Sequence, residues 1–121
     1  MEPLILCVEM DPGKLMRVSL LASSLGIRTA EVKRNRQGML LGALCGVDPA
    51  GKEKAGQVPG EMLVMAHFPD ALADRFLKAL RESGCGVALK AMLTPYNRFW
   101  TCEQLWKELA REAVAMGGNA K

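Results

Sequence analysis

The chain has 121 residues, of which 50% are apolar and 24% charged, and its formal net charge is +3. This length and composition are typical of one globular domain, which buries about two thirds of the surface of its extended chain. A net charge this small gives no reason to expect nucleic acid as a partner. The longest uncharged apolar stretch, GMLLGALCGV, is far too short to span a bilayer, so we expect no membrane association.

The cysteine pattern indicates a reducing compartment. The four cysteines, Cys7, Cys45, Cys85 and Cys102, are scattered without a C-x-x-C pair, and His67 is the single histidine of the chain. This pattern predicts no metal site, and no glycine-rich phosphate-binding sequence is present, so we expect no cofactor. Disulfides are rare in the cytosol, and reduced thiols in a cytoplasmic protein are the simplest interpretation.

The first third of the chain predicts a strand, a helix and a second strand. Residues 4–10 are almost continuously apolar, as in a central strand that is covered on both faces. This run is interpreted as a strand and not as a signal peptide, because Glu2 precedes it and no basic segment does. Asp11 and Pro12 then predict a helix with aspartate as N-cap, which ends at Gly26. The more polar residues 28–33 predict an edge strand.

The same order of elements returns later in the chain. We predict a second apolar strand at residues 62–68, a helix that starts at Pro69 and Asp70 and ends at Gly84, and a strand at residues 87–93. We interpret both Asp11 and Asp70 as helix caps. An offset of 58 residues aligns the two halves without a gap, placing Ile5 on Leu63, Met10 on Phe68, Val18 on Phe76 and Gly26 on Gly84. The sequence therefore predicts two strand-helix-strand units of equal length.

Between the two units, the sequence predicts a short helix and an exposed loop. Apolar residues within 37–47 have helical spacing, whereas DPAGKEKAGQVPGE is rich in glycine, proline and charge. A loop of this length is a candidate for partner contact.

We divide the single domain, residues 1–121, into four parts: 1–33 (first unit), 34–61 (short helix and loop), 62–93 (second unit) and 94–117 (aromatic loop and C-terminal helix).

The predicted fold class is α/β, with a four-stranded sheet and about four helices. The 28-residue connection between the second and third strands slightly favours a doubly wound parallel sheet of order 2-1-3-4, because parallel strands need long crossovers. The equal-length repeat favours the alternative, a ferredoxin-like βαββαβ fold of order 4-1-3-2 with an inserted helix and a C-terminal helix. In the parallel order, the loops that begin at Glu9, His67 and Thr94 meet at the carboxyl ends of the strands, where ligands of α/β sheets bind.

The loop before the last helix, LTPYNRFWT, holds three of the six aromatic residues: Tyr96, Phe99 and Trp100. Thr101 and Gln104 have the spacing of a capping box, and Trp100 and Leu105 that of a hydrophobic staple. The apolar face of this helix continues to Met116, and Gly117 ends it. Part of the aromatic loop is therefore expected to anchor the last helix.

Three polar residues of this loop are candidates for ligand contact. Thr94, Asn97 and Arg98 could donate hydrogen bonds to an anionic or polar ligand, whereas a structural turn at Pro95 and Asn97 is the favoured alternative. Under the binding hypothesis, alanine at Asn97 and Arg98 abolishes binding and leaves the stability nearly unchanged. For Cys102, a buried structural thiol is favoured over a reactive one.

Six basic residues lie near the end of the second strand or in the following loop: Arg28, Lys33, Arg34, Arg36, Lys52 and Lys54. We interpret them as charges that protect an edge strand, because no aromatic residue lies between them to stack on nucleotides.

The segment ALKAMLTPYNRFWTCEQL resembles the bacterial family known as domain of unknown function 3783. The shared pattern L-K-A-x-L-T-x-x-N-x-x-W is carried here by Leu89, Lys90, Ala91, Leu93, Thr94, Asn97 and Trp100. The resemblance implies no activity, because the family has no established function. It does imply that Lys90, Thr94, Asn97 and Trp100 form one unit.

The leading functional hypothesis is a non-catalytic module that binds a small ligand or a protein partner through residues 94–100. The candidate contact residues are Lys90, Thr94, Tyr96, Asn97, Arg98 and Trp100. One alternative is an enzyme of unrecognised type at the same loop, in which Cys102 could also take part. A second alternative is a structural protein that forms a homodimer.

Overall fold

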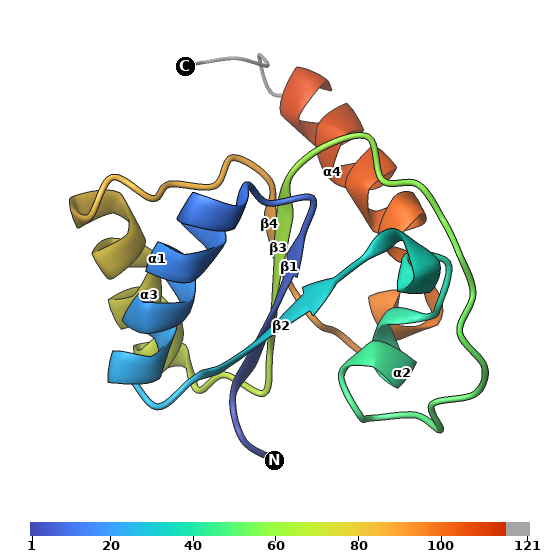
Figure 1. Cartoon of the computed structure of the whole chain (residues 1–121), viewed down its shortest axis with the longest axis horizontal. Coiled ribbons are helices and arrows are strands. Elements are labelled where there is room, and N and C mark those ends of the chain that lie inside the picture. The colour runs from blue at the N-terminus through green and yellow to red at the C-terminus, as the bar shows by residue number, and fades with distance from the viewer. Residues whose placement is uncertain (116–121) are drawn as a thin grey trace.

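The computed structural model describes residues 1–115 and contains one four-stranded sheet with helices on both faces (Figure 1). In chain order the elements are β1 (Leu4–Val8), α1 (Pro12–Ser24), β2 (Arg28–Val32), the 3-10 helix η1 (Arg34–Arg36), α2 (Leu41–Leu44), β3 (Met62–Ala66), α3 (Asp70–Glu82), β4 (Lys90–Met92), the 3-10 helix η2 (Asn97–Phe99) and α4 (Cys102–Ala115). The predicted end of the last helix, at Met116 and Gly117, lies outside the described residues.

The strand order is β2-β1-β3-β4, which confirms the predicted order 2-1-3-4 and excludes the ferredoxin-like order. The sheet is mixed, however: β1 pairs with β2 and β3 with β4 in parallel, whereas the central strands β1 and β3 are antiparallel. The prediction of an all-parallel sheet is therefore wrong. Because β3 begins at the edge where β2 ends, the long connection need not cross back along the sheet, and it forms η1, α2 and a loop instead.

The two strand-helix-strand units are related by an approximate two-fold axis. At the offset of 58 residues, β1 and α1 coincide with β3 and α3 at both ends of each element. In the antiparallel ladder, Leu6 pairs with Val64, which is its own equivalent in the repeat, so the axis passes between these two residues. Gly26 and Gly84 end the two helices with φ values of +76° and +75°, a conformation that glycine adopts without a steric penalty.

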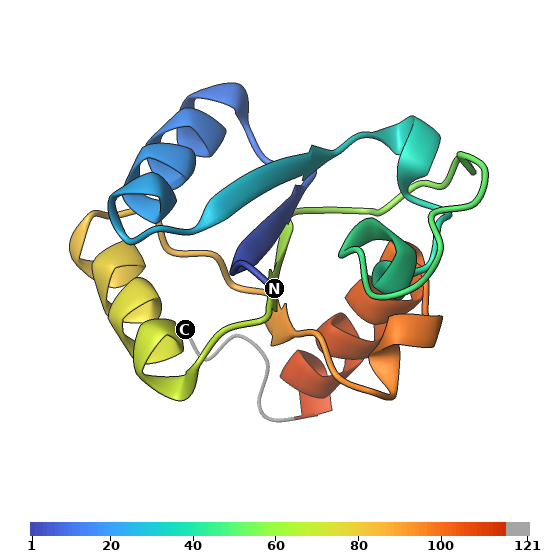
Figure 2. The same ribbon diagram turned by 90° about the horizontal axis from the view of Figure 1, so that it is seen from below.

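Each face of the sheet carries its own hydrophobic core. The helices α1 and α3 cover one face, and α2, α4 and the loop before β3 lie over the other (Figures 1 and 2). Along β1, Ile5 and Cys7 pack toward α1 and α3, whereas Leu6 and Val8 pack toward α2 and α4. This alternation buries both faces of the central strands, which is why their sequences are continuously apolar.

The helix starts agree only in part with the prediction. Asp11 caps α1, since its Oδ2 accepts a hydrogen bond from the Lys14 amide at 3.1 Å. Asp70 is not a cap: it is the first residue of α3, and Pro69 occupies the N-cap position without a side-chain bond. At the start of α4, Thr101 and Gln104 form the predicted capping box, with reciprocal bonds of 2.8 and 3.2 Å.

The helix predicted over residues 37–47 is reduced to one turn, Leu41–Leu44. The reason is that Gly38 donates its amide hydrogen to the Lys54 carbonyl at 2.9 Å instead of continuing a helix. The last strand is also shorter than predicted, three residues long at Lys90–Met92. Among the described helices, none combines the length and apolarity that a membrane crossing needs.

Candidate functional site

Within residues 1–115, two residues other than glycine have a left-handed backbone, and each directly follows a central strand. Glu9 has a φ of +52° and His67 a φ of +63°, and the two occupy equivalent positions in the repeat. A left-handed conformation costs such residues about 1–2 kcal/mol. Strain of this kind persists where the surrounding structure holds it, and it is concentrated at functional sites.

The side chains of the two strained residues contact the segments that cover the α2 and α4 face of the sheet. Oε2 of Glu9 accepts a hydrogen bond from the side chain of buried Gln37 at 2.8 Å. At the opposite edge, Nε2 of His67 lies 3.1 Å from the carbonyl oxygen of Cys45, the C-cap of α2. A carbonyl can only accept, so Nε2 carries a proton in this contact, and in the neutral imidazole Nδ1 of His67 is then left as a hydrogen-bond acceptor.

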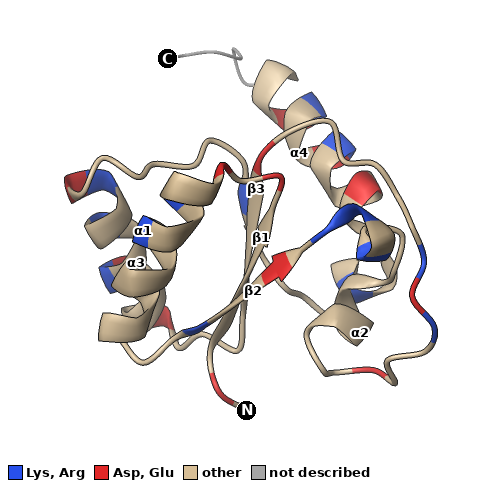
Figure 3. Cartoon of the chain, in the orientation of Figure 1, with Lys and Arg blue, Asp and Glu red and all other residues tan. Residues whose placement is uncertain are grey.

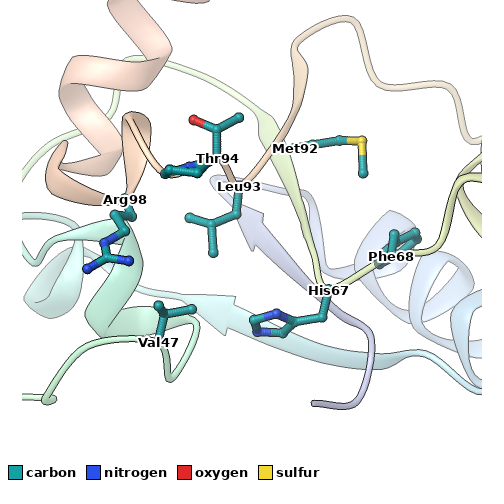
Figure 4. A pocket seen from close by; sticks show the side chains of 8 residues that line it. Val47, His67, Phe68, Met92, Leu93, Thr94 and Arg98 are labelled. Carbon is teal, nitrogen blue, oxygen red and sulfur yellow. The ribbon is translucent and has the colours of Figure 1, made fainter.

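An open cleft of about 330 Å³ lies at the carboxyl ends of β3 and β4, and we call it the β3–β4 cleft. Figure 4 shows the His67 ring and the Arg98 guanidinium on opposite sides of the Leu93 side chain. The cleft is lined by Val47, His67, Phe68, Met92, Leu93, Thr94, Pro95 and Arg98. Two of the three loops expected at such an edge therefore meet here. The loop at Glu9 lies at the opposite edge, because β1 runs antiparallel to β3.

The loop after β4 is held by its own polar groups. The amide hydrogen of Thr94 is donated to Oδ1 of Asn97 at 2.8 Å, and the amide hydrogen of Asn97 to Oγ1 of Thr94 at 3.0 Å. The Nδ2 of Asn97 donates to the Met92 carbonyl at 3.0 Å. Asn97 is only 7% exposed. Its side chain thus fixes the loop from inside, so the expectation that its replacement leaves the stability unchanged disagrees with this geometry.

Arg98 is the cationic side chain of the cleft. Its Nη2 lies 3.3 Å from Oδ1 of Asp48, and its guanidinium carbon lies 4.7 Å from the centre of the Phe99 ring. The ring and the carboxylate hold the guanidinium in place. Nε of Arg98 and Oδ2 of Asp48 are buried, and neither has a hydrogen-bond partner within residues 1–115. The pair therefore falls short of a bidentate contact.

The remaining predicted contact residues lie in different places. Lys90 points away from the cleft, because its ammonium group donates to the Val87 carbonyl. Tyr96 is 81% exposed at the tip of the loop. Trp100 packs with Leu105 in the core between the sheet and α4, as the predicted staple requires. The structure thus brings Thr94 and Arg98 together at the cleft, with Asn97 supporting them.

Sequence reasoning placed the loop that begins at His67 at this edge but did not name His67 as a contact residue, and it missed Val47. The repeat could have identified His67, because the offset of 58 residues places it on Glu9 at the end of a central strand. Val47 follows α2 and reaches the cleft only through tertiary packing, so no local pattern predicts it.

The cysteines offer no thiolate beside the loop. Cys102 is fully buried, and burial raises the pKa of its thiol to about 12. Burial likewise raises the pKa of Cys7 to about 12 and that of Cys45 to about 11. These three thiols are therefore protonated at neutral pH. In the part of the chain that the structure describes, no three histidine, cysteine or acidic side chains are grouped as metal ligands would be.

Comparison with known proteins gave one match. Residues 61–116 match the family described as Domain of unknown function (DUF3783), which confirms the resemblance inferred from residues 89–100. The matched region spans β3 to α4 and so includes every lining residue of the β3–β4 cleft except Val47. No curated protein and no solved structure matches the chain significantly.

Proposed function

We propose that this chain, whose residues 61–116 belong to the DUF3783 family, is a non-catalytic binding module for a small acidic ligand. The observation that supports this proposal is the composition of the β3–β4 cleft, in which Arg98 and His67 stand in walls that are otherwise mostly apolar. Ligand sites are typically concave and apolar, with a few polar groups that orient the ligand, and a volume of about 330 Å³ suits a small molecule.

Arg98 would bind the acidic group. A guanidinium has five N–H donors, and the contact with Asp48 at 3.3 Å uses only one of its nitrogens. Arginine matches the planar geometry of a carboxylate, and its charge strengthens the hydrogen bonds. The stacking of Arg98 on Phe99 reduces the entropy that the side chain would lose on binding.

His67 would bind a second polar group of the same ligand. In the neutral imidazole its Nδ1 is an acceptor, because the Cys45 carbonyl holds the proton on Nε2. Since Arg98 and His67 lie on opposite sides of Leu93 (Figure 4), a ligand that contacts both would cross the Leu93 side chain. The ligand would therefore carry a carboxylate or phosphate at one end, an apolar middle, and an N–H or O–H donor.

A protein partner at the same loop is the second candidate. Tyr96 and Phe99 are 81% and 57% exposed beside the cleft, and aromatic side chains are enriched at protein interfaces. Within this proposal we place the protein in the cytoplasm, because all four cysteines are free and buried, as expected in a reducing compartment; a bacterial source is proposed from the sequence resemblance alone.

The test is ligand-observed NMR with benzoate, phenylacetate and 4-hydroxyphenylacetate, and with benzamide as the uncharged probe. We expect the acids to bind the wild-type protein and benzamide to bind more weakly, with affinity for the acids lost in Arg98→Met. Arg75→Met, at an exposed position on α3, is the matched control and should bind like the wild type. Equal binding of the acids by both variants would exclude Arg98 as the anion-binding group.

A further inference from the structure

A second concave surface lies on the other side of α2, and it shares no residue with the β3–β4 cleft. This basic groove has a volume of about 430 Å³. Met39, Leu40 and Ala43 supply apolar surface, and Lys52 and Lys54 line it from the loop before β3. No aromatic side chain is among the described residues that line the groove.

The loop that lines the groove is held in place by contacts with η1 and the residues next to it. The loop lies against η1 through two backbone hydrogen bonds of 2.9 Å, one from Gly38 to the Lys54 carbonyl and one from Gly56 to the Arg34 carbonyl. The contact is so close that a Cβ atom on Gly38 would lie 2.3 Å from the carbonyl oxygen of Ala55. Glycine is therefore required at position 38 for the loop to lie against η1.

Buried Gln37 supports the same loop from below. It is fully buried, and its Oε1 accepts a hydrogen bond from the Val58 amide at 2.8 Å. Its Nε2 donates to Glu9 and to the Val32 carbonyl, so the side chain joins the loop to the ends of β1 and β2. A fully connected buried polar group of this kind fixes the position of the segments that it joins.

The net positive charge of the protein is concentrated around the groove. Figure 3 shows the basic residues of η1 and those of the loop on the same side of the molecule. The basic residues on η1, at its N-cap and on the loop are Lys33, Arg34, Arg36, Lys52 and Lys54. Residues 33–61 hold these five basic residues and three acidic ones, Asp48, Glu53 and Glu61, so this segment has a net charge of +2, whereas the rest of the chain, with eleven basic and ten acidic residues, has +1. Among the described residues, only Arg34 of these five basic residues has an acidic partner, Glu9 at 3.6 Å.

We propose that the basic groove binds an acidic peptide segment of a partner protein. Carboxylates of the segment would pair with Lys52 and Lys54, and an apolar side chain between them would pack on Leu40 and Ala43. The positive rim supplies charge complementarity, and the apolar surface supplies an anchor. Peptide is favoured over nucleic acid, because the groove offers apolar aliphatic surface and no aromatic ring for base stacking.

The test is fluorescence anisotropy with three short labelled peptides, in which glutamate pairs flank a leucine, a phenylalanine or a tryptophan. Versions with glutamine in place of glutamate are the charge controls. We expect Lys52→Glu/Lys54→Glu to weaken binding by at least about tenfold, and Leu40→Ser by about threefold or more. Arg75→Glu/Lys107→Glu makes the same change in net charge at exposed positions elsewhere, and should change the affinity less than about twofold.

Thermal unfolding followed by circular dichroism should first establish that each variant folds. Binding of the glutamate peptides with loss in the Lys52 and Lys54 variant alone would support the proposal. It is overturned if the wild type binds none of the peptides, if the control pair loses as much affinity, or if Leu40→Ser binds like the wild type. Displacement of the peptides by a short oligothymidylate that binds more tightly would also overturn it, in favour of a nucleic-acid surface.

Discussion

Replacing Asn97 by alanine tests whether this residue stabilises the loop at the β3–β4 cleft. The substitution removes the acceptor for the Thr94 amide, at 2.8 Å, and the donor to the Met92 carbonyl, at 3.0 Å. Both backbone groups lose these partners in a partly buried environment. We therefore expect a loss of stability, although the residue lies in a loop.

The expected magnitude follows from the two broken hydrogen bonds. A fully buried polar group left without a partner costs about 1–3 kcal/mol, so two such groups would cost about 2–6 kcal/mol; because these two are only partly buried, we expect the lower part of that range, about 2–4 kcal/mol. Native domains have a free energy of unfolding of about 5–15 kcal/mol, so this loss is a large fraction of the total. For a domain of this size, the loss lowers the melting temperature by about 6–16 °C.

The assay is urea unfolding followed by circular dichroism, with Asn35→Ala as the matched control. Asn35 is exposed in η1, and its replacement should change the free energy of unfolding by less than about 0.5 kcal/mol. If Asn97→Ala proves as stable as the control, its amide does not hold the loop, and the structural role assigned to it is wrong.

Three further substitutions or conditions test other parts of the structure by the same unfolding assay. His67→Gly should be more stable than His67→Ala by about 1 kcal/mol, because only glycine adopts the left-handed backbone without strain; equal stabilities would contradict this. Gly42→Ala should lower the free energy of unfolding by about 1–3 kcal/mol, because the new Cβ would lie 2.0 Å from Oδ2 of Asp48, the partner of Arg98. Gly86→Ala is the control: its Cβ would have no atom within 4 Å, so the free energy of unfolding should be nearly unchanged. Alkaline pH should destabilise the protein, because burial raises the pKa of Cys7 and of Cys102 to about 12. The stability that these protonated thiols confer is complete below the unfolded-state pKa of about 9 and is lost as the pH rises toward 12. The loss is up to about 1.4 kcal/mol per pH unit for each thiol. If the free energy of unfolding of Cys102→Ala fell with pH as steeply as that of the wild type, this contribution of Cys102 would be refuted.

The sequence predicted the repeat because it depends on local patterns: apolar runs, helix stripes and the glycines at positions 26 and 84 recur at one offset, and the structure places β1 and α1 at residues equivalent to those of β3 and α3. The predicted strand order is confirmed, but the reason given for it, a long crossover between parallel strands, does not hold, because β3 runs antiparallel to β1. The direction of β3 relative to β1 could not be predicted in the same way. A central strand that is buried on both faces has the same apolar sequence whether its neighbour runs parallel or antiparallel.

The candidate site was predictable only in part. The loop and Arg98 were identified from composition, and the favoured interpretation of Asn97 as a structural turn residue agrees with its side-chain bonds to the loop backbone. In contrast, residues 37–47 have apolar residues at helical spacing, and only the contact of Gly38 with the loop at Lys54 prevents a longer helix. In the second case a tertiary hydrogen bond decided between two locally acceptable structures, whereas the bonds of Asn97 lie within its own loop.

The most direct test of the proposed ligand site is a nitrogen-15 NMR titration of the wild-type protein with 4-hydroxyphenylacetate. The proposal predicts saturable shifts of the backbone amides at Val47, His67 and Thr94, which come from three separate segments around the β3–β4 cleft. Shifts confined to other regions, such as the basic groove at Lys52 and Lys54, or no saturable shifts at all, would contradict it.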